Sequence, residues 1–244
     1  FAPYKRAALL FQDQARLLKM LDDPARPLRI AFAGKAHPAD GLGKDLVKKV
    51  FELTRKPEFQ GKVYFLEDYD VRLARALVQG VDVWMNTPIR WLEASGTSGM
   101  KAAANGALNL SIGDGWWPEA FDGENGWLLG GSEYKDQALL DQFDASSLYR
   151  TLEEEVVPLY FERDQEGVPA RWLARVQHCL ATVPGQFNTN RMVLDYYERA
   201  YSHLATGFES LRTGKRAQLK ALVAEAQRVR KGFAELSIAS AHVG

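Results

Sequence analysis

The chain has 244 residues, of which 46% are hydrophobic and 25% are charged, and this composition is typical of a folded globular protein. Lysine and arginine together number 31, as do aspartate and glutamate, so the formal net charge is zero. Because nucleic-acid binders usually carry a basic excess that neutralises phosphates, this balance argues against a nucleic-acid partner.

The sequence also argues against a membrane protein. It contains no run of about 18 apolar residues, which a membrane-spanning helix would need, and no signal-peptide pattern. The single cysteine, Cys179, lies in the apolar stretch 172–180, which predicts a buried thiol and no metal site. We therefore expect a cytoplasmic protein. The first residue is Phe1 rather than methionine, which suggests a fragment.

Strand-like and helix-like patterns alternate through the first half of the chain. Apolar residues recur at helical spacing between residues 4 and 21, which predicts an amphipathic helix. Further on, short apolar runs predict strands at 28–33, 62–66, 81–85 and 107–112, and amphipathic segments predict helices at 43–54, 71–78 and 99–105. This alternation predicts an α/β fold with a parallel sheet covered by helices.

In such sheets, ligands bind at the carboxyl ends of the strands. The loops at 34–42, 67–70, 86–98 and 113–126 are therefore the candidate sites. From residue 136 onward the pattern is mostly helical, interrupted at Pro158 and at Pro184-Gly185, with helices expected at 136–142, 146–156, 169–182, 188–205 and 215–235.

The segment from Glu93 to Lys101 (EASGTSGMK) has the richest chemistry. Its glycines and small hydroxyl residues precede a helical stretch, and a helix N-terminus of this kind binds anions through exposed amide groups and a favourable dipole. Lys101 lies one turn beyond Thr97 and is followed by three alanines. In a core-facing helix such a lysine would lose hydration and deprotonate more easily, as covalent amine chemistry requires. From spacing alone, an N-capped helix with a surface lysine is the more common explanation.

The string EASGTSGMKAAANGALNLS closely resembles the cofactor segment of the α-glucan (glycogen, starch or maltodextrin) phosphorylases. The resemblance implies that Lys101 forms the Schiff base with pyridoxal phosphate and that Thr97 and Ser98 lie beside the cofactor phosphate. It also implies that Glu93, Ser95 and Gly96 hold the glucosyl hydroxyls. The segments 114–119 and 123–126 resemble the short bacterial branch of the family rather than the animal branch.

Other segments resemble the same family in order and spacing, over roughly residues 4–200. The stretch Tyr4-Lys5-Arg6 resembles the end of a basic motif, which implies a catalytic phosphate contact for Lys5 and a sugar contact for Tyr4. Phe65 to Asp70 resembles a strand end at which Tyr69 borders the cofactor. The loop 34–38 and the segment 187–192 also match family segments.

The resemblance implies a Rossmann-like parallel sheet with helices on both faces, the C-terminal lobe of a GT-B type glycosyltransferase, followed by C-terminal helices. It implies reversible phosphorolysis of α-1,4-glucan by orthophosphate, which gives α-D-glucose 1-phosphate with retention. The partners would be glucan, orthophosphate and the missing N-terminal lobe of the same protein, and an oligomer is compatible with the sequence. We expect the lobe at residues 1–205 and a helical extension at 206–244, and we expect the isolated fragment to be inactive or weakly active.

Two other functions are weighed against this one. A sugar-nucleotide-dependent glucan synthase shares the two-lobe architecture but needs no Schiff-base lysine, so the motif that ends at Lys101 argues against it. A non-catalytic glucan-binding module would use Trp116 and Trp117 as a platform that stacks on sugars. Core packing explains these two tryptophans equally well.

Overall fold

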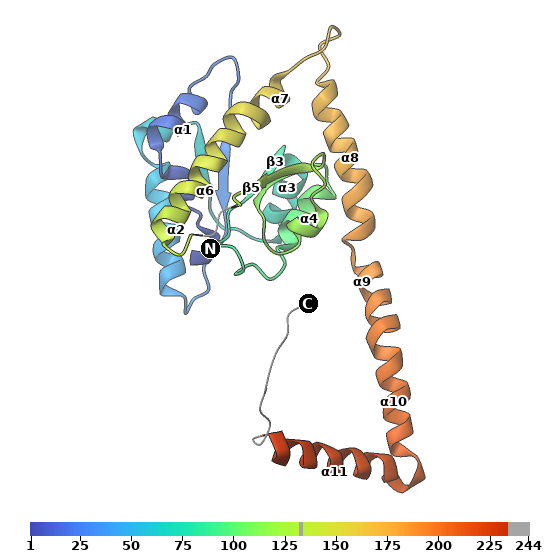
Figure 1. Cartoon of the computed structure of the whole chain (residues 1–244). Helices are drawn as coiled ribbons and strands as arrows, with labels where there is room; N and C mark the ends of the chain where they lie inside the picture. Colours follow the sequence, from blue (N-terminus) through green and yellow to red (C-terminus); the bar gives the residue numbers. More distant parts are fainter. Residues whose placement is uncertain (132–133, 234–244) are drawn as a thin grey trace, which may run out of the picture. The chain divides into compact units, whose positions relative to one another are not determined.

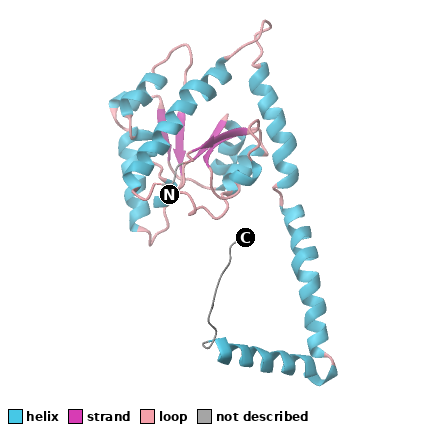
Figure 2. Cartoon of the chain, in the orientation of Figure 1, coloured by secondary structure: helices cyan, strands magenta, loops and turns pink. Residues whose placement is uncertain are grey.

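A computed structural model describes residues 1–131 and 134–233 of the chain. The chain divides into two compact units, Phe1–Gln186 and Phe187–Gly244. The first unit contains all the described strands, which lie among helices in Figure 2, and the described part of the second unit is helical. The expected division into 1–205 and 206–244 stays a prediction, and its boundary falls inside a helix, Ser202–Arg212.

The described residues of the first unit form five parallel strands in two sheets. The strands are β1 (Ile30–Ala33), β2 (Val63–Leu66), β3 (Val83–Asn86), β4 (Leu108–Ile112) and β5 (Gly126–Leu129). In one sheet β1 pairs with β2, with Ile30 opposite Val63, and in the other β4 lies between β3 and β5. The predicted parallel α/β architecture is confirmed. In the described residues the parallel strands form two sheets, and no ladder joins them.

Helices flank these strands in the first unit (Figure 1). They are α1 (Gln14–Leu21), α2 (Gly41–Thr54), α3 (Val71–Gly80), α4 (Thr97–Ala103), α5 (Trp117–Ala120), α6 (Gln137–Thr151), α7 (Val157–Phe161) and α8 (Ala170–Gln186). Helix α2 packs on β2, α6 on β5, and α4 and α8 on β4. The second unit has α9 (Thr189–Tyr196), α10 (Ser202–Arg212) and α11 (Ala217–Gly232).

Aspartate side chains fix where several helices begin. Each accepts a hydrogen bond of 2.9 Å from the amide three residues further on, and such a cap stabilises a helix by about 1 kcal/mol. The capping residues are Asp13 of α1, Asp40 of α2, Asp70 of α3 and Asp136 of α6.

The predicted helix over residues 4–21 is wrong in its first half. Two 3-10 turns, Pro3–Lys5 and Leu9–Phe11, precede α1 there, and Arg6 between them has a left-handed backbone with φ of 47°. Pro158 and Pro184 also interrupt the helices less than expected. Pro158 lies in the first turn of α7, where a missing N–H costs little, and a π-helical turn at Leu152–Val156 leads into it. Pro184 lies in the last turn of α8.

The core of the first unit lies around β4, all of whose residues are buried. Ala102 and Ala103 of α4 have no exposed surface, and their small size brings that helix close to β4. Cys179 of α8 is also fully buried, and burial raises the pKa of its thiol to about 11, which confirms the expected core thiol. In the described part of the chain, no helix has both the length and the hydrophobicity that a bilayer crossing requires.

Candidate functional site

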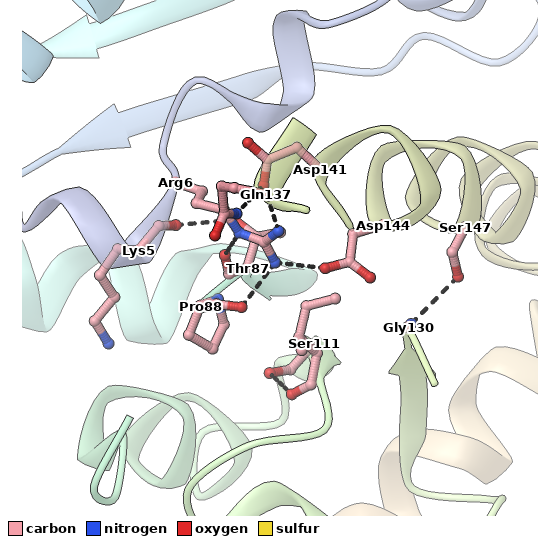
Figure 3. A network of polar contacts seen from close by, with 11 residues as sticks. Lys5, Arg6, Thr87, Pro88, Ser111, Gly130, Gln137, Asp141, Asp144 and Ser147 are labelled. Atoms are coloured by element: carbon pink, nitrogen blue, oxygen red, sulfur yellow. Dashed lines mark hydrogen bonds and ion pairs between the residues drawn. The ribbon is translucent and has the colours of Figure 1, made fainter. Parts of the chain in front are cut away.

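The site begins at the N-terminal turn, which the Arg6 side chain holds in place. Its buried guanidinium donates to the carbonyl oxygens of Thr87 at 3.0 Å and Pro88 at 2.7 Å, just beyond β3. It also donates to the carboxylates of Asp141 at 2.8 Å and Asp144 at 2.7 Å on α6 (Figure 3). One side chain therefore ties the turn to the end of β3 and to α6.

Two hydrogen bonds to backbone carbonyls of the turn complete this attachment. The Thr87 hydroxyl donates to the Lys5 carbonyl at 3.0 Å, and the Ile89 amide donates to the Tyr4 carbonyl at 2.7 Å. The Lys5 side chain extends away from the Arg6 guanidinium (Figure 3). The turn thus places the Arg6 guanidinium in a buried network and holds the Lys5 ammonium outside it.

The Glu93 carboxylate contacts two side chains of that turn, those of Tyr4 and Lys5. The Lys5 ammonium forms an ion pair with Glu93 Oε2, and the Tyr4 hydroxyl donates to Oε1 at 3.4 Å. The Glu93 side chain is only 7% exposed, and its amide donates to Asp114 Oδ2 at 2.9 Å. The structure therefore brings together Tyr4, Lys5 and Glu93, three residues that the sequence predicts for the site.

The loop after Glu93 packs tightly on the segment that follows β4. The Trp116 amide donates to the Ser95 carbonyl at 2.9 Å. Gly96, with φ of 87°, precedes α4, and a Cβ added there would lie 3.6 Å from the Glu93 carboxyl carbon. Ser95 and Gly96 therefore lie next to Glu93, and the start of α4 is beside the Lys5–Glu93 pair.

Lys101 lies on the exposed side of α4. Its Nζ donates to the Thr97 hydroxyl at 3.3 Å, one turn earlier, while Ala102 and Ala103 face the core. The exposed position agrees with the surface lysine that spacing alone favours. The alternative of a core-facing, dehydrated amine is wrong for this chain, because the alanines and not the lysine occupy the buried face. The amine is accessible to a ligand from solvent.

The remaining predicted residues stand further apart. Ser98 is half-buried in the first turn of α4. Tyr69 is half-buried in the loop between β2 and α3, and among the described residues no hydrogen bond joins it to the other predicted site residues. Its place beside a cofactor stays a prediction.

Trp116 and Trp117 are core residues rather than a sugar platform. Their exposed fractions are 6% and 1%, and the Trp117 indole donates to the Trp127 carbonyl at 3.1 Å. Their rings meet edge to face at a centroid distance of 5.2 Å. The open choice between stacking on sugars and core packing is decided for packing.

Sequence reasoning missed the residues that support the site. Asp114, which anchors the Glu93 amide, follows β4 in a candidate loop, and that position is the signal that could have identified it. Thr87 follows β3 in the same way. Asp144 lies in the middle of α6 among ordinary helical residues, so the sequence carries no local signal for it.

Parallel strands flanked by helices, with polar residues gathered where β3 and β4 end, define a Rossmann-like α/β lobe of the kind found in GT-B glycosyltransferases. A family model described as carbohydrate phosphorylase matches residues 3–154. The chain belongs to the carbohydrate phosphorylase family.

Individual relatives agree with this assignment. The chain is 47% identical over 201 residues to a glycogen phosphorylase of Aquifex aeolicus, covering 82% of this chain and 29% of the relative. It is 48% identical over 203 residues to a maltodextrin phosphorylase of Thermococcus litoralis, covering 83% and 24%. It is 46% identical over 206 residues to a glycogen phosphorylase of Mycobacterium bovis, covering 84% and 24%. The chain therefore spans less than a third of the length of these relatives.

Among the glycines of these packed loops, Gly115 should tolerate an added side chain least. It has φ of 59°, and an added Cβ would fall on the Ser95 carbonyl oxygen, a rigid backbone atom. Gly61, with φ of 73°, has open space around it and is a matched control for backbone strain. We expect Gly115→Ala to lower the free energy of unfolding by about 1–3 kcal/mol more than Gly61→Ala, as measured by urea denaturation. Equal losses in the two variants would contradict the described contact.

Asp144 should make stability depend on pH. Burial raises the pKa of its carboxyl, although its hydrogen bond and the charge of Arg6 act in the opposite direction. With a raised pKa, the folded state binds the proton more tightly than the unfolded state. This stabilisation is present below the ordinary pKa near 4 and is lost as the pH rises through the folded value, at about 1.4 kcal/mol per unit of pKa difference.

We therefore expect the unfolding free energy of the natural chain, minus that of Asp144→Asn, to fall as the pH rises above about 4. Urea denaturation at several pH values measures this difference. Asp122→Asn is the contrasting control. Burial acts to raise the Asp122 pKa, but the Glu124 amide and the His178 ring outweigh burial and lower it. The unfolding free energy of the natural chain, minus that of Asp122→Asn, should therefore rise with pH. The same trend for both variants would contradict the assignment.

Proposed function

We propose that this chain forms part of an α-1,4-glucan phosphorylase. The reaction is the reversible, retaining transfer of a glucosyl group from glucan to orthophosphate, which gives α-D-glucose 1-phosphate. The observation that carries the proposal is the cluster of Tyr4, Lys5 and Glu93 beside the helix that bears an accessible Lys101, all within the segment matched by the family model.

The residues around α4 fit pyridoxal phosphate. Lys101 presents an accessible amine that would hold the cofactor covalently, with the Thr97 hydroxyl 3.3 Å from it. The first amide groups of any helix have no partner within the helix, so those of Thr97 and Ser98 are available to a phosphate oxygen. We place Tyr69 at the edge of this group. When bound, the cofactor supplies a phosphate with a second pKa of about 6, which exchanges protons at neutral pH.

The chain's other site residues act on the two substrates. The Lys5 side chain is one-third exposed, and its ammonium provides positive charge for orthophosphate. The Glu93 carboxylate and the Ser95 and Gly96 backbone provide acceptors and donors for the glucosyl hydroxyls, and Tyr4 stands beside them. Glycosyl transfer passes through a transition state that resembles an oxocarbenium ion, so an anion held next to the sugar stabilises it.

The alternative functions lack an observation in their favour. A glucan-binding module that uses Trp116 and Trp117 would need exposed rings, and both rings are buried. A sugar-nucleotide-dependent synthase would leave the accessible Lys101 without a role. A cytoplasmic location and the oligomeric state stay predictions.

Lys101 should be the site of cofactor attachment. Incubation with pyridoxal phosphate, reduction with borohydride and peptide mass spectrometry should show a pyridoxyl adduct at Lys101 and none at that position in Lys101→Arg. Lys48→Arg, which changes an exposed lysine of α2, should be labelled at Lys101 like the natural chain. An adduct on a different lysine with Lys101 unmodified would overturn the assignment.

Turnover should need more of the phosphorylase polypeptide than this chain contains. The matched segments cover only 29% and 24% of the relatives named glycogen and maltodextrin phosphorylase, and we propose that the remainder, including an N-terminal lobe, holds the glucan and closes over the cofactor. We expect little or no release of glucose 1-phosphate when the chain alone is given maltodextrin and orthophosphate. Release at rates comparable to a full-length relative, assayed in parallel, would contradict this.

A further inference from the structure

Two residues with separate proposed roles bind each other in this structure. The proposed function gives Lys5 to orthophosphate and Glu93 to the glucosyl hydroxyls, yet the two side chains form an ion pair. In this arrangement the cation for one substrate is held by the carboxylate for the other. The following inference rests on the proposed function and concerns how its two substrates affect each other.

The two side chains differ in how easily each can replace its ion-pair partner by another partner. Lys5 is one-third exposed, and water can replace Glu93 around its ammonium. Glu93 is 7% exposed and, apart from Lys5, its carboxylate has only the 3.4 Å contact from the Tyr4 hydroxyl among the described residues. A buried carboxylate that loses its cation is strongly destabilised unless other donors replace it. Lys5 is therefore free to leave only when something else satisfies Glu93.

Hydrogen bonds hold the backbone of both residues, and the Glu93 side chain packs against a neighbouring loop. The Asp114 carboxylate holds the Glu93 amide, and the Gly115 backbone lies against the Glu93 side chain, with an added Cβ at 3.1 Å from Glu93 Cγ. Lys5 is equally fixed at its backbone by the Thr87 hydroxyl. Of the two side chains, that of Lys5 is the more exposed and flexible, so we infer that it is the one that moves when the pair separates.

We propose that the Lys5–Glu93 ion pair is a latch that couples the phosphate and sugar sites. Orthophosphate draws the Lys5 ammonium away from Glu93, and sugar hydroxyls donate to the carboxylate that is left. Each ligand therefore makes binding of the other more favourable. Phosphate alone binds weakly because it must leave Glu93 unsatisfied, and sugar alone binds weakly because Lys5 occupies the acceptor.

Coupling of this kind is reciprocal: glucose must raise phosphate affinity by the same factor by which phosphate raises glucose affinity. The test is a titration of the chain with inorganic phosphate, with and without D-glucose, followed by NMR of the amides of residues 4–6 and 93. We expect glucose to lower the apparent dissociation constant for phosphate by about fivefold or more. This measurement needs no substitution, so it holds whether or not a variant folds.

Glu93→Gln removes the latch. A neutral amide does not retain the ammonium, so we expect phosphate to bind several-fold more tightly than to the natural chain and to respond no longer to glucose. Glu153→Gln, which removes the partly exposed ion pair with Arg16, is the matched control and should behave like the natural chain. Lys5→Met should abolish the phosphate response at residues 4–6.

Two results would overturn the inference. Phosphate affinity that is unchanged or weaker in Glu93→Gln, with shifts still centred on Lys5, would show that the ammonium binds both groups at once, since it has three donors. Absence of any phosphate response at residues 4–6 would show that Lys5 is no anion site. The pyridoxyl labelling of Lys101 tests the proposed function separately, so a failure of the latch is distinguishable from a failure of the phosphorylase assignment.

Discussion

The Arg6 guanidinium joins parts of the first unit that are far apart in the sequence. It binds the carbonyls after β3 and two carboxylates of α6, so it connects residues 6, 87–88 and 141–144 in one buried network. Arginine suits this position because its planar group has five donors in a fixed geometry, which a lysine ammonium lacks. Breaking such a buried pair by removing one partner typically costs about 3–5 kcal/mol, because the remaining charge is left unsatisfied.

The geometry of the candidate site follows from that network. With Arg6 fixed, the preceding residue Lys5 has little backbone freedom. Its side chain extends away from the Arg6 guanidinium (Figure 3) and pairs with Glu93. Glu93 is fixed in turn by Asp114, which follows β4. The site is therefore built from the ends of two adjacent strands and a turn attached to them, and the short helix α4 starts within the same arrangement.

Local patterns in the sequence predicted most of the elements, but not how they join. Strands such as 62–66 are short apolar runs bounded by turns, and four of the five were predicted within two residues. β5 was missed because Gly126-Trp127-Leu128-Leu129 follows directly on a polar turn and is too short to show alternation. The failed half of the helix at 4–21 has a tertiary cause, since Arg6 gains more from its distant partners than from helical geometry.

The candidate site shows the same division between local and distant information. Thr97 and Lys101 lie one helical turn apart, so spacing alone placed them together. The contact between Lys5 and Glu93 joins residues 88 positions apart, and only the resemblance to a family had put both in one site. Burial was the least predictable property: the sequence could not tell which face of α4 turns inward, nor that both tryptophans after β4 are covered.

The buried thiol of Cys179 has a practical consequence for biophysical work on this chain. Since it is the single cysteine and is fully covered in the fold, a second cysteine introduced at an exposed position would react with a maleimide dye or spin label essentially alone. Pairs of such labels on the two compact units would give distances between them by fluorescence transfer or electron resonance. The natural sequence is thus already suited to site-specific spectroscopy without first removing a native residue.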